Sequence, residues 1–142
     1  MNMYSKLKKQ HQKEINEFPF IFAFTKEKLI ENMAKLGLKK DETNKLLSLG
    51  GGTFIRKSDK EKLNQMFNRH EEELKKAINE DLTGEGFIYQ MFDYELANHE
   101  YCITYELDDT LNALGLTIDE IQNDDKLLHG LKKAIENQKS CF

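Results

Sequence analysis

One segment, Gly84–Thr104 (GEGFIYQMFDYELANHEYCIT), constrains the fold most because it has the densest aromatic and aliphatic content in the chain. At 3.6 residues per turn it predicts a helix that begins after the Gly84-Glu85-Gly86 break and turns one broad face inward. The first half of that face is apolar: Phe87, Ile88, Met91, Phe92 and Tyr94. The second half is polar: Glu95, Asn98, His99 and Cys102. The rest of the chain is expected to pack around this helix.

The polar half of the inward face is the first candidate site. A buried carboxylate or imidazole needs a partner, because leaving it unpaired costs several kcal/mol. Glu95 and His99 are four residues apart, so their side chains can meet on one face of a helix.

Length and composition predict one soluble globular domain over residues 1–142, with 39% hydrophobic and 32% charged residues. The net charge of −4 and the scarcity of arginine argue against a phosphate-reading surface, so a nucleic-acid partner is not expected. No window is apolar enough to span a membrane, and no apolar segment of a signal peptide follows the basic N-terminus. We therefore expect a cytoplasmic protein in which Cys102 and Cys141 are free thiols.

The remaining pattern predicts a mainly α-helical fold of six to seven helices. The other predicted helices cover residues 3–18, 26–36, 41–49, 59–80, 104–114 and 124–138, and residues 137–142 are expected to fray. Thr25 is the predicted N-cap of the second of these helices, and Gly37 with Leu38 is expected to end it in a Schellman-type turn. The alternating phenylalanines of residues 18–24 favour a strand, and we pair residues 21–24 with 53–56 in a short antiparallel ribbon.

Three histidines fall on inward helical faces: His11, His70 and His99. Together with Glu95 and Cys102 they are the ligand types that a divalent metal prefers, so His70, Glu95, His99 and Cys102 form a candidate metal site. Their spacing matches no compact metal motif. The interpretation we favour is that each histidine satisfies a hydrogen bond in the core, and no cofactor is predicted.

The second candidate is the stretch Gly50-Gly51-Gly52-Thr53-Phe54-Ile55-Arg56-Lys57. Glycines let the backbone approach an anion, while Arg56 and Lys57 supply positive charge, so a phosphate or nucleotide could bind there. The stretch matches neither common phosphate-binding motif. A tight turn that uses glycine for its positive φ values is the interpretation we favour.

A partner protein would need an exposed apolar or aromatic patch. Tyr89 and Leu96 lie off the predicted buried face, and Tyr105 follows it, so these three residues are the candidates for such a patch.

Three stretches of the sequence, GGGTFIRK, GEGFIYQMFDYELANHEYCIT and DDTLNALGLT, resemble a family of small uncharacterised proteins from Gram-positive bacteria and their phages. The resemblance implies a cytoplasmic accessory protein, of prophage or other mobile-element origin, and brings no activity with it. We therefore predict a non-enzymatic interaction or regulatory protein that acts on a host protein. The alternative is a small-ligand or metal-dependent protein that uses Glu95, His99 and His70, with hydrolysis as its candidate activity.

Overall fold

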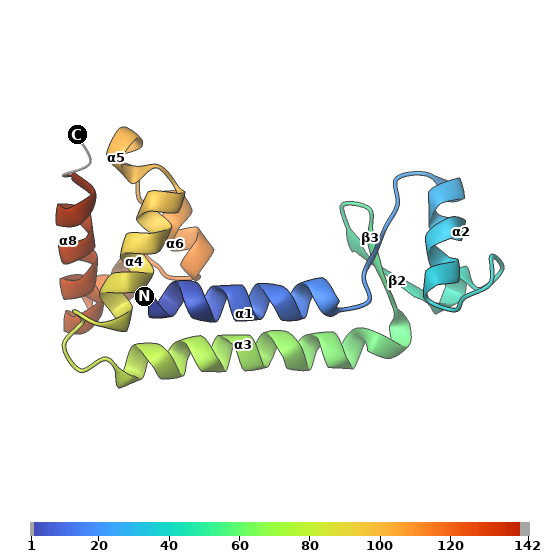
Figure 1. Ribbon diagram of the computed structural model, residues 1–142, viewed down its shortest axis with the longest axis horizontal. Helices are drawn as coiled ribbons and strands as arrows, with labels where there is room; N and C mark the ends of the chain where they lie inside the picture. The colour runs from blue at the N-terminus through green and yellow to red at the C-terminus, as the bar shows by residue number, and fades with distance from the viewer. Residues whose placement is uncertain (1, 140–142) are drawn as a thin grey trace. The chain divides into compact units, whose positions relative to one another are not determined.

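The computed structural model describes residues 2–139, which divide into two compact units (Figure 1). The helical unit consists of residues 2–12 and 72–139, and the sheet unit consists of residues 13–71. Two long helices, α1 (Met3–Glu17) and α3 (Lys60–Glu80), each contribute residues to both units. The predicted mainly helical fold is confirmed, and the described residues hold eight α-helices and three strands.

The other elements of the sheet unit are β1 (Ile21–Phe22), α2 (Lys26–Lys35), β2 (Leu46–Gly50) and β3 (Thr53–Arg56), with 3-10 turns at Thr43–Lys45 and Lys57–Asp59. The other elements of the helical unit are α4 (Phe87–Asn98), α5 (Tyr101–Thr104), α6 (Asp108–Leu114), α7 (Ile118–Gln122) and α8 (Asp125–Lys139). No helix among residues 2–139 has the length and apolar character needed to cross a membrane.

The sheet is antiparallel, with strand order β1-β3-β2. Pairing of Ile21 with Phe54 and of Phe22 with Thr53 confirms the predicted ribbon. The predicted helix over residues 41–49 is wrong, because Leu46–Gly50 is a strand that pairs with β3. A short apolar run does not distinguish a helix from a buried strand, and here the glycine turn that follows brings β2 back onto β3.

Each face of the sheet carries its own apolar cluster, because successive side chains of a strand point to opposite faces. One cluster gathers Ile21, Leu46 and Phe54 around the fully buried Met33 of α2. The other gathers the fully buried Ile55 with Leu47, Phe18 and Phe20 and with the first turns of α3, through Leu63 and Met66. The sheet is therefore the middle layer of its unit.

Helix α2 begins and ends as the sequence predicts. The Thr25 hydroxyl accepts a hydrogen bond from the Lys28 N–H at 3.1 Å, which makes it the N-cap. Gly37 has a φ of +74°, and the Leu38 N–H donates to the Met33 carbonyl at 3.0 Å, as in a Schellman motif.

The core of the helical unit forms between α4 and α8, which lie side by side (Figure 1). Ile88, Met91 and Phe92 of α4 are fully buried, and Leu127 and Leu131 of α8 pack in the same cluster. The predicted organising role of the segment after Gly86 is therefore confirmed for its apolar half.

The single helix predicted to continue to Thr104 is wrong in its second half. Helix α4 ends at Asn98, and Glu100 adopts a left-handed φ of 57° before the one-turn helix α5 begins. The His99 N–H still donates to the Glu95 carbonyl at 3.0 Å, whereas the Glu100 N–H donates to Ala97 at 3.2 Å, so the last turn tightens and ends. Asn, His and Glu differ little in hydrophobicity, so hydrophobic periodicity alone gives no sign of this break.

The last elements also differ from prediction in their boundaries. Helix α6 begins at Asp108, four residues after Thr104, and ends at Gly115 with a φ of 66°. Helix α7, which is not among the predicted helices, begins after Thr117, whose hydroxyl accepts a hydrogen bond from the Glu120 N–H at 3.2 Å. Helix α8 continues to Lys139. Cys102 is a free thiol, and Cys141 lies outside the described residues.

Candidate functional site

The buried carboxylate of Glu95 is the centre of a polar cluster in the helical unit. Glu95 is 0% exposed, and the Lys8 ammonium donates to both of its oxygens, at 2.7 and 3.1 Å. Helix α4 carries Glu95 inward one turn after Met91 and Phe92, while α1 carries Lys8 to it from a distant part of the sequence. The prediction that Glu95 is buried is confirmed, but the partner is Lys8.

Tyr4 completes this cluster. Burial raises the pKa of the Tyr4 hydroxyl, and the neighbouring Glu95 charge and the hydrogen bond to Glu95 raise this pKa further. The Tyr4 ring packs edge-on against Phe87 and Tyr94, at centroid distances of 5.9 and 5.6 Å. The phenol therefore stays protonated and donates to the carboxylate, which leaves Glu95 paired with two donors and closed to solvent.

His99 and Cys102 do not continue the buried polar face of α4. His99 forms the C-cap of α4, and its Nε2 is buried without a hydrogen-bond partner among the described residues. Cys102 lies on α5, beyond the left-handed turn at Glu100, and is half-buried. The turn at Glu100 therefore removes the helical register that would have placed Glu95, His99 and Cys102 on one stripe.

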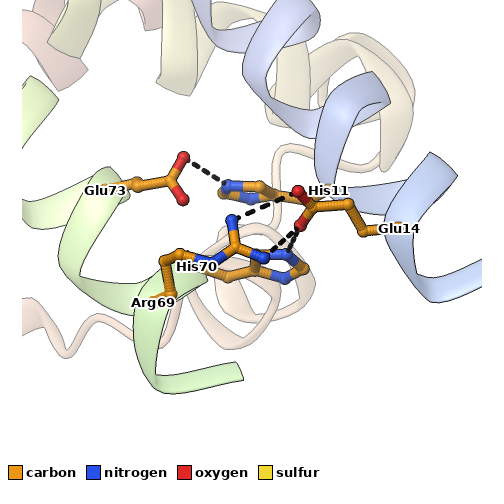
Figure 2. Close-up of polar contacts among 5 residues, drawn as sticks. All are labelled: His11, Glu14, Arg69, His70 and Glu73. Carbon is orange, nitrogen blue, oxygen red and sulfur yellow. Dashed lines mark hydrogen bonds and ion pairs between the residues drawn. The ribbon is translucent and has the colours of Figure 1, made fainter. Parts of the chain in front are cut away.

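The other two inward histidines each pair with a glutamate between α1 and α3 (Figure 2). In the helical unit, His11 Nε2 lies 3.4 Å from the Glu73 carboxylate. In the sheet unit, His70 Nε2 contacts the Glu14 carboxylate, and Arg69 binds both Glu14 oxygens at 3.2 and 2.8 Å. Both pairs are satisfied contacts that join two helices, in agreement with the structural interpretation of these histidines.

Glu14 carries a pH-dependent share of the stability of the sheet unit. The Arg69 hydrogen bonds, then that of His70, lower the pKa of Glu14 from 4.5 to about 2. A carboxyl whose folded pKa is depressed stabilises the fold above its unfolded pKa, and this contribution is lost as the pH falls through the folded pKa. Wild-type protein should therefore lose more unfolding free energy between about pH 5 and about pH 2 than a Glu14→Gln variant, measured by urea denaturation.

Glu17→Gln is the matched control, because Glu17 is an exposed glutamate on the same helix and makes no ion pair within residues 2–139. If Glu14→Gln and Glu17→Gln lost the same unfolding free energy as the pH fell, the Glu14 contacts would not contribute to stability.

The structure does not assemble the predicted metal ligands. His70 belongs to the sheet unit, whereas Glu95, His99 and Cys102 belong to the helical unit. Among the residues that the structure describes, no three His, Cys, Asp or Glu side chains come together as metal ligands. The Glu95 oxygens, which the proposed metal would need, are instead bound by Lys8.

The glycines of the second candidate site form the hairpin turn between β2 and β3. Gly50, Gly51 and Gly52 have φ values of +88°, +59° and +76°, which explains the cluster by conformation. Arg56 lies at the end of β3 that is far from the glycine turn. In an extended strand of this length the two ends are about 10 Å apart. The Arg56 guanidinium pairs with the buried Asp59 at 2.7 Å, and Lys57 begins the next turn. The turn and the two basic residues therefore do not converge on one anion.

The three predicted surface residues differ in exposure. Leu96 is 0% exposed, so its assignment off the buried face is wrong, because both sides of this part of α4 are covered by the core. Tyr89 is half-buried, with the Lys133 ammonium 5.0 Å from its ring centroid. Tyr105 is 61% exposed.

An apolar groove that the sequence pattern did not reveal lies in the helical unit. Two adjoining cavities of about 550 and about 490 Å³ share Met3, Ala77, Glu80 and Phe87. The apolar lining of both together, which we call the apolar groove, consists of Met3, Leu7, Ala77, Leu82 and Phe87. Its floor is the 6% exposed Phe87, whereas Met3 and Leu82 at its walls are 59% and 85% exposed.

Leu82 is held outward by an ordered loop. The Asp81 carboxylate accepts hydrogen bonds from the backbone N–H groups of Thr83, Gly84, Gly86 and Ile88, at 3.1, 2.9, 3.2 and 3.0 Å. Partial burial raises the pKa of Asp81, but these four hydrogen bonds outweigh it and leave the pKa below its ordinary value. A leucine in a polar loop sequence, Asp81-Leu82-Thr83-Gly84, is the signal that could have indicated this surface.

In the comparison with protein families, residues 3–137 match a family of unknown function (DUF7659). Comparison with curated proteins and with solved structures found no match. The match covers both units and assigns no role to any residue.

Proposed function

The chain belongs to DUF7659, a family of unknown function, and we propose from its structure that it is a non-enzymatic interaction protein whose apolar groove binds a helix of a partner protein. The observation that carries this proposal is the groove itself, with Met3 and Leu82 exposed at its walls above the buried Phe87. Exposed apolar side chains around a concave surface are typical of a protein-interaction site.

The elements that line the groove favour a helical occupant. Its walls come from α1 and the last turns of α3, and an amphipathic helix laid along them would bury its apolar stripe on Met3, Leu7 and Ala77. Because Asp81 fixes the loop that carries Leu82, little conformational entropy is lost when a partner covers that side chain.

The charges beside the groove indicate the polar side of this partner. Glu73 pairs with His11, and Lys76 Nζ lies 3.9 Å from Glu80 Oε1, so each of these side chains has its partner within the helical unit. Lys6 also lines the groove, is exposed, and makes no ion pair within residues 2–139. A partner helix with a carboxylate beside its apolar stripe would complement Lys6.

Two finer proposals rest on the sequence resemblance. We propose that the protein acts in the cytoplasm of a Gram-positive bacterium, and that it came there with a phage or another mobile element. The partner would then be a host protein that the chain regulates by occupying one of its helices.

A double variant, Met3→Glu with Leu82→Glu, should abolish partner binding without loss of fold, because both side chains are already in water. Hot-spot residues of an interface each cost about 2 kcal/mol or more when they are changed, so the double variant should lose about 100-fold or more in affinity even where the two losses are not fully additive. The measurement is quantitative affinity capture from host lysate by mass spectrometry, followed by titration of the purified partner.

Ile118→Glu is the matched control, because Ile118 is 43% exposed in the same unit and does not line the groove. A partner recovered with wild type and with this control but not with the double variant supports the proposal. Equal recovery with all three proteins would show that the groove is not the binding surface.

A further inference from the structure

A row of phenylalanine rings extends outward along one face of the sheet unit. Phe18, Phe20, Phe22 and Phe24 occupy alternate positions, with ring centroids 5.0 Å apart for Phe18 and Phe20 and 6.4 Å apart for Phe20 and Phe22. The first two rings are half-buried, whereas Phe22 and Phe24 are 61% and 86% exposed. The row therefore ends in two rings that the fold leaves in water.

The backbone holds these two rings in place. Ile21 and Ala23, which alternate with them, are 4% and 8% exposed and anchor the strand on its other side. The Ala23 N–H donates to the Gly52 carbonyl at 2.8 Å, so the pairing with the hairpin continues past β1. The Phe24 ring lies against Gly52, where a Cβ atom would come within 2.8 Å of it. Phe22 and Phe24 are thus presented by ordered structure.

The charge of the chain is divided unevenly between its units. The sheet unit has 12 Lys and Arg against 9 Asp and Glu, a net charge of +3, whereas the rest of the chain has 9 against 16, a net charge of −7. Both arginines of the sheet unit are held in ion pairs, Arg56 with Asp59 and Arg69 with Glu14, so lysines carry the excess. The whole-chain charge of −4, which argues against a nucleic-acid partner, is the sum of these opposite values.

We propose that the sheet unit binds single-stranded nucleic acid, with bases stacked on Phe22 and Phe24 and with lysines facing the phosphates. Exposed aromatic rings and an excess of positive charge, both present in the sheet unit, are the two elements of sequence-tolerant single-strand binding. Every base has an aromatic face, so each of the two exposed rings can stack on one base whatever the sequence of the strand. Lysines suffice for such binding, because it needs positive charge and no bidentate reading of base edges.

The charge distribution and the exposed rings favour single-stranded nucleic acid over two other partners, a second copy of the chain and an acidic protein segment. A second copy docking through the same face would bring two units of +3 together, which opposes self-association. An acidic protein segment would satisfy the charge but has no need of two exposed aromatic rings. A strand of nucleotides matches both features.

The test is fluorescence anisotropy of a labelled 20-nucleotide oligo-dT with the full chain at low salt. We expect saturable binding that weakens steeply as salt is added. The variant Phe22→Leu with Phe24→Leu keeps apolar side chains and removes both aromatic faces. It should bind about 25-fold or more weakly, if each stacked base contributes about 5-fold or more. Tyr105→Leu is the matched control, because Tyr105 is 61% exposed like Phe22 but lies in the acidic helical unit, and its affinity should not change.

Three outcomes would overturn the proposal. The first is no saturable binding of oligo-dT, and the second is equal affinity of wild type and the double leucine variant. The third is displacement of the oligonucleotide by poly-glutamate of equal charge as readily as by unlabelled oligo-dT, which would identify an acidic protein partner instead.

Discussion

Lys8→Met is expected to lower the free energy of unfolding by about 3–5 kcal/mol, the usual cost of removing one partner from a buried charge pair. The Lys8 ammonium donates to both oxygens of Glu95, whose side chain has no exposed surface. Methionine keeps most of the apolar stem of lysine but leaves the carboxylate without its counter-charge. The loss of the cation–π contact, in which Lys8 Nζ lies 5.3 Å from the Tyr94 ring centroid, adds to the effect.

Glu95→Gln should cost less, about 1–3 kcal/mol, because the pair is not symmetric in its exposure. The side chain of Lys8 is 40% exposed, so its ammonium can turn toward water when the carboxylate is absent. The double variant Lys8→Met with Glu95→Leu should recover most of the stability, since apolar replacement of a buried ion pair is often neutral.

Urea denaturation followed by circular dichroism measures all three variants, and the single variant Glu95→Leu completes the double-mutant cycle that gives the coupling free energy of the pair. The double-mutant cycle must show a loss smaller than the sum of the two single losses. Equal costs for Lys8→Met and Glu95→Gln, or a cost below about 1 kcal/mol for Lys8→Met, would contradict the buried-pair interpretation.

Glu95 also shows how much of a buried ion pair can be predicted from the sequence. Its inward direction follows from helical periodicity, and its need for a partner follows from the cost of burying a charge. Its partner could not be predicted, because Lys8 is 87 residues away and lies on an otherwise solvated lysine-rich helix. The same is true of His70 and Glu14, whose residue types suggest a contact only after α1 and α3 are known to be neighbours.

Secondary structure could be predicted from the sequence where the local signals were strong. The prediction was wrong where the sequence fitted two structures equally well. The predicted N-cap at Thr25 placed the start of α2 correctly, because a side-chain hydrogen bond marks this position. The run Leu46–Gly50 fits a helix or a strand equally well, and only pairing with β3 decides for the strand. The break at Glu100 depends on a left-handed backbone at a residue that is not glycine, which periodicity does not detect.

The prediction of an exposed partner-binding surface is wrong at Leu96 for a related reason. Leu96 was assigned to the surface from one helical face, but α4 is a central helix covered on more than one side. Met3 and Leu82, the exposed walls of the apolar groove, lie at the first turn of a helix and in a loop, where periodicity assigns no face. Exposure at such positions is set by tertiary packing, which a single sequence does not contain.

Gly84→Ala is expected to be the most disruptive of the small substitutions, with a loss of about 3 kcal/mol or more. An alanine Cβ at this position would lie 2.3 Å from the Lys126 carbonyl oxygen, a backbone atom that cannot move aside alone. The residue also has a φ of +88°, where a side chain adds about 1–2 kcal/mol of strain. Overpacking of a close contact typically costs a further ~1–3 kcal/mol. The start of α4 and the first turn of α8 would have to separate, and the core between them would open.

Gly115→Ala separates these two costs, because Gly115 has a φ of +66° but a Cβ there would meet nothing within 4 Å. It should lose only the strain of about 1–2 kcal/mol. The difference between the two variants in urea denaturation, with similar m-values, therefore measures how closely the backbones of α8 and the Gly84 loop approach. An equal loss in both would mean that only backbone strain matters and that the two segments are not in contact. A larger loss for Gly84→Ala would show that the core of the helical unit depends on a position where only glycine fits.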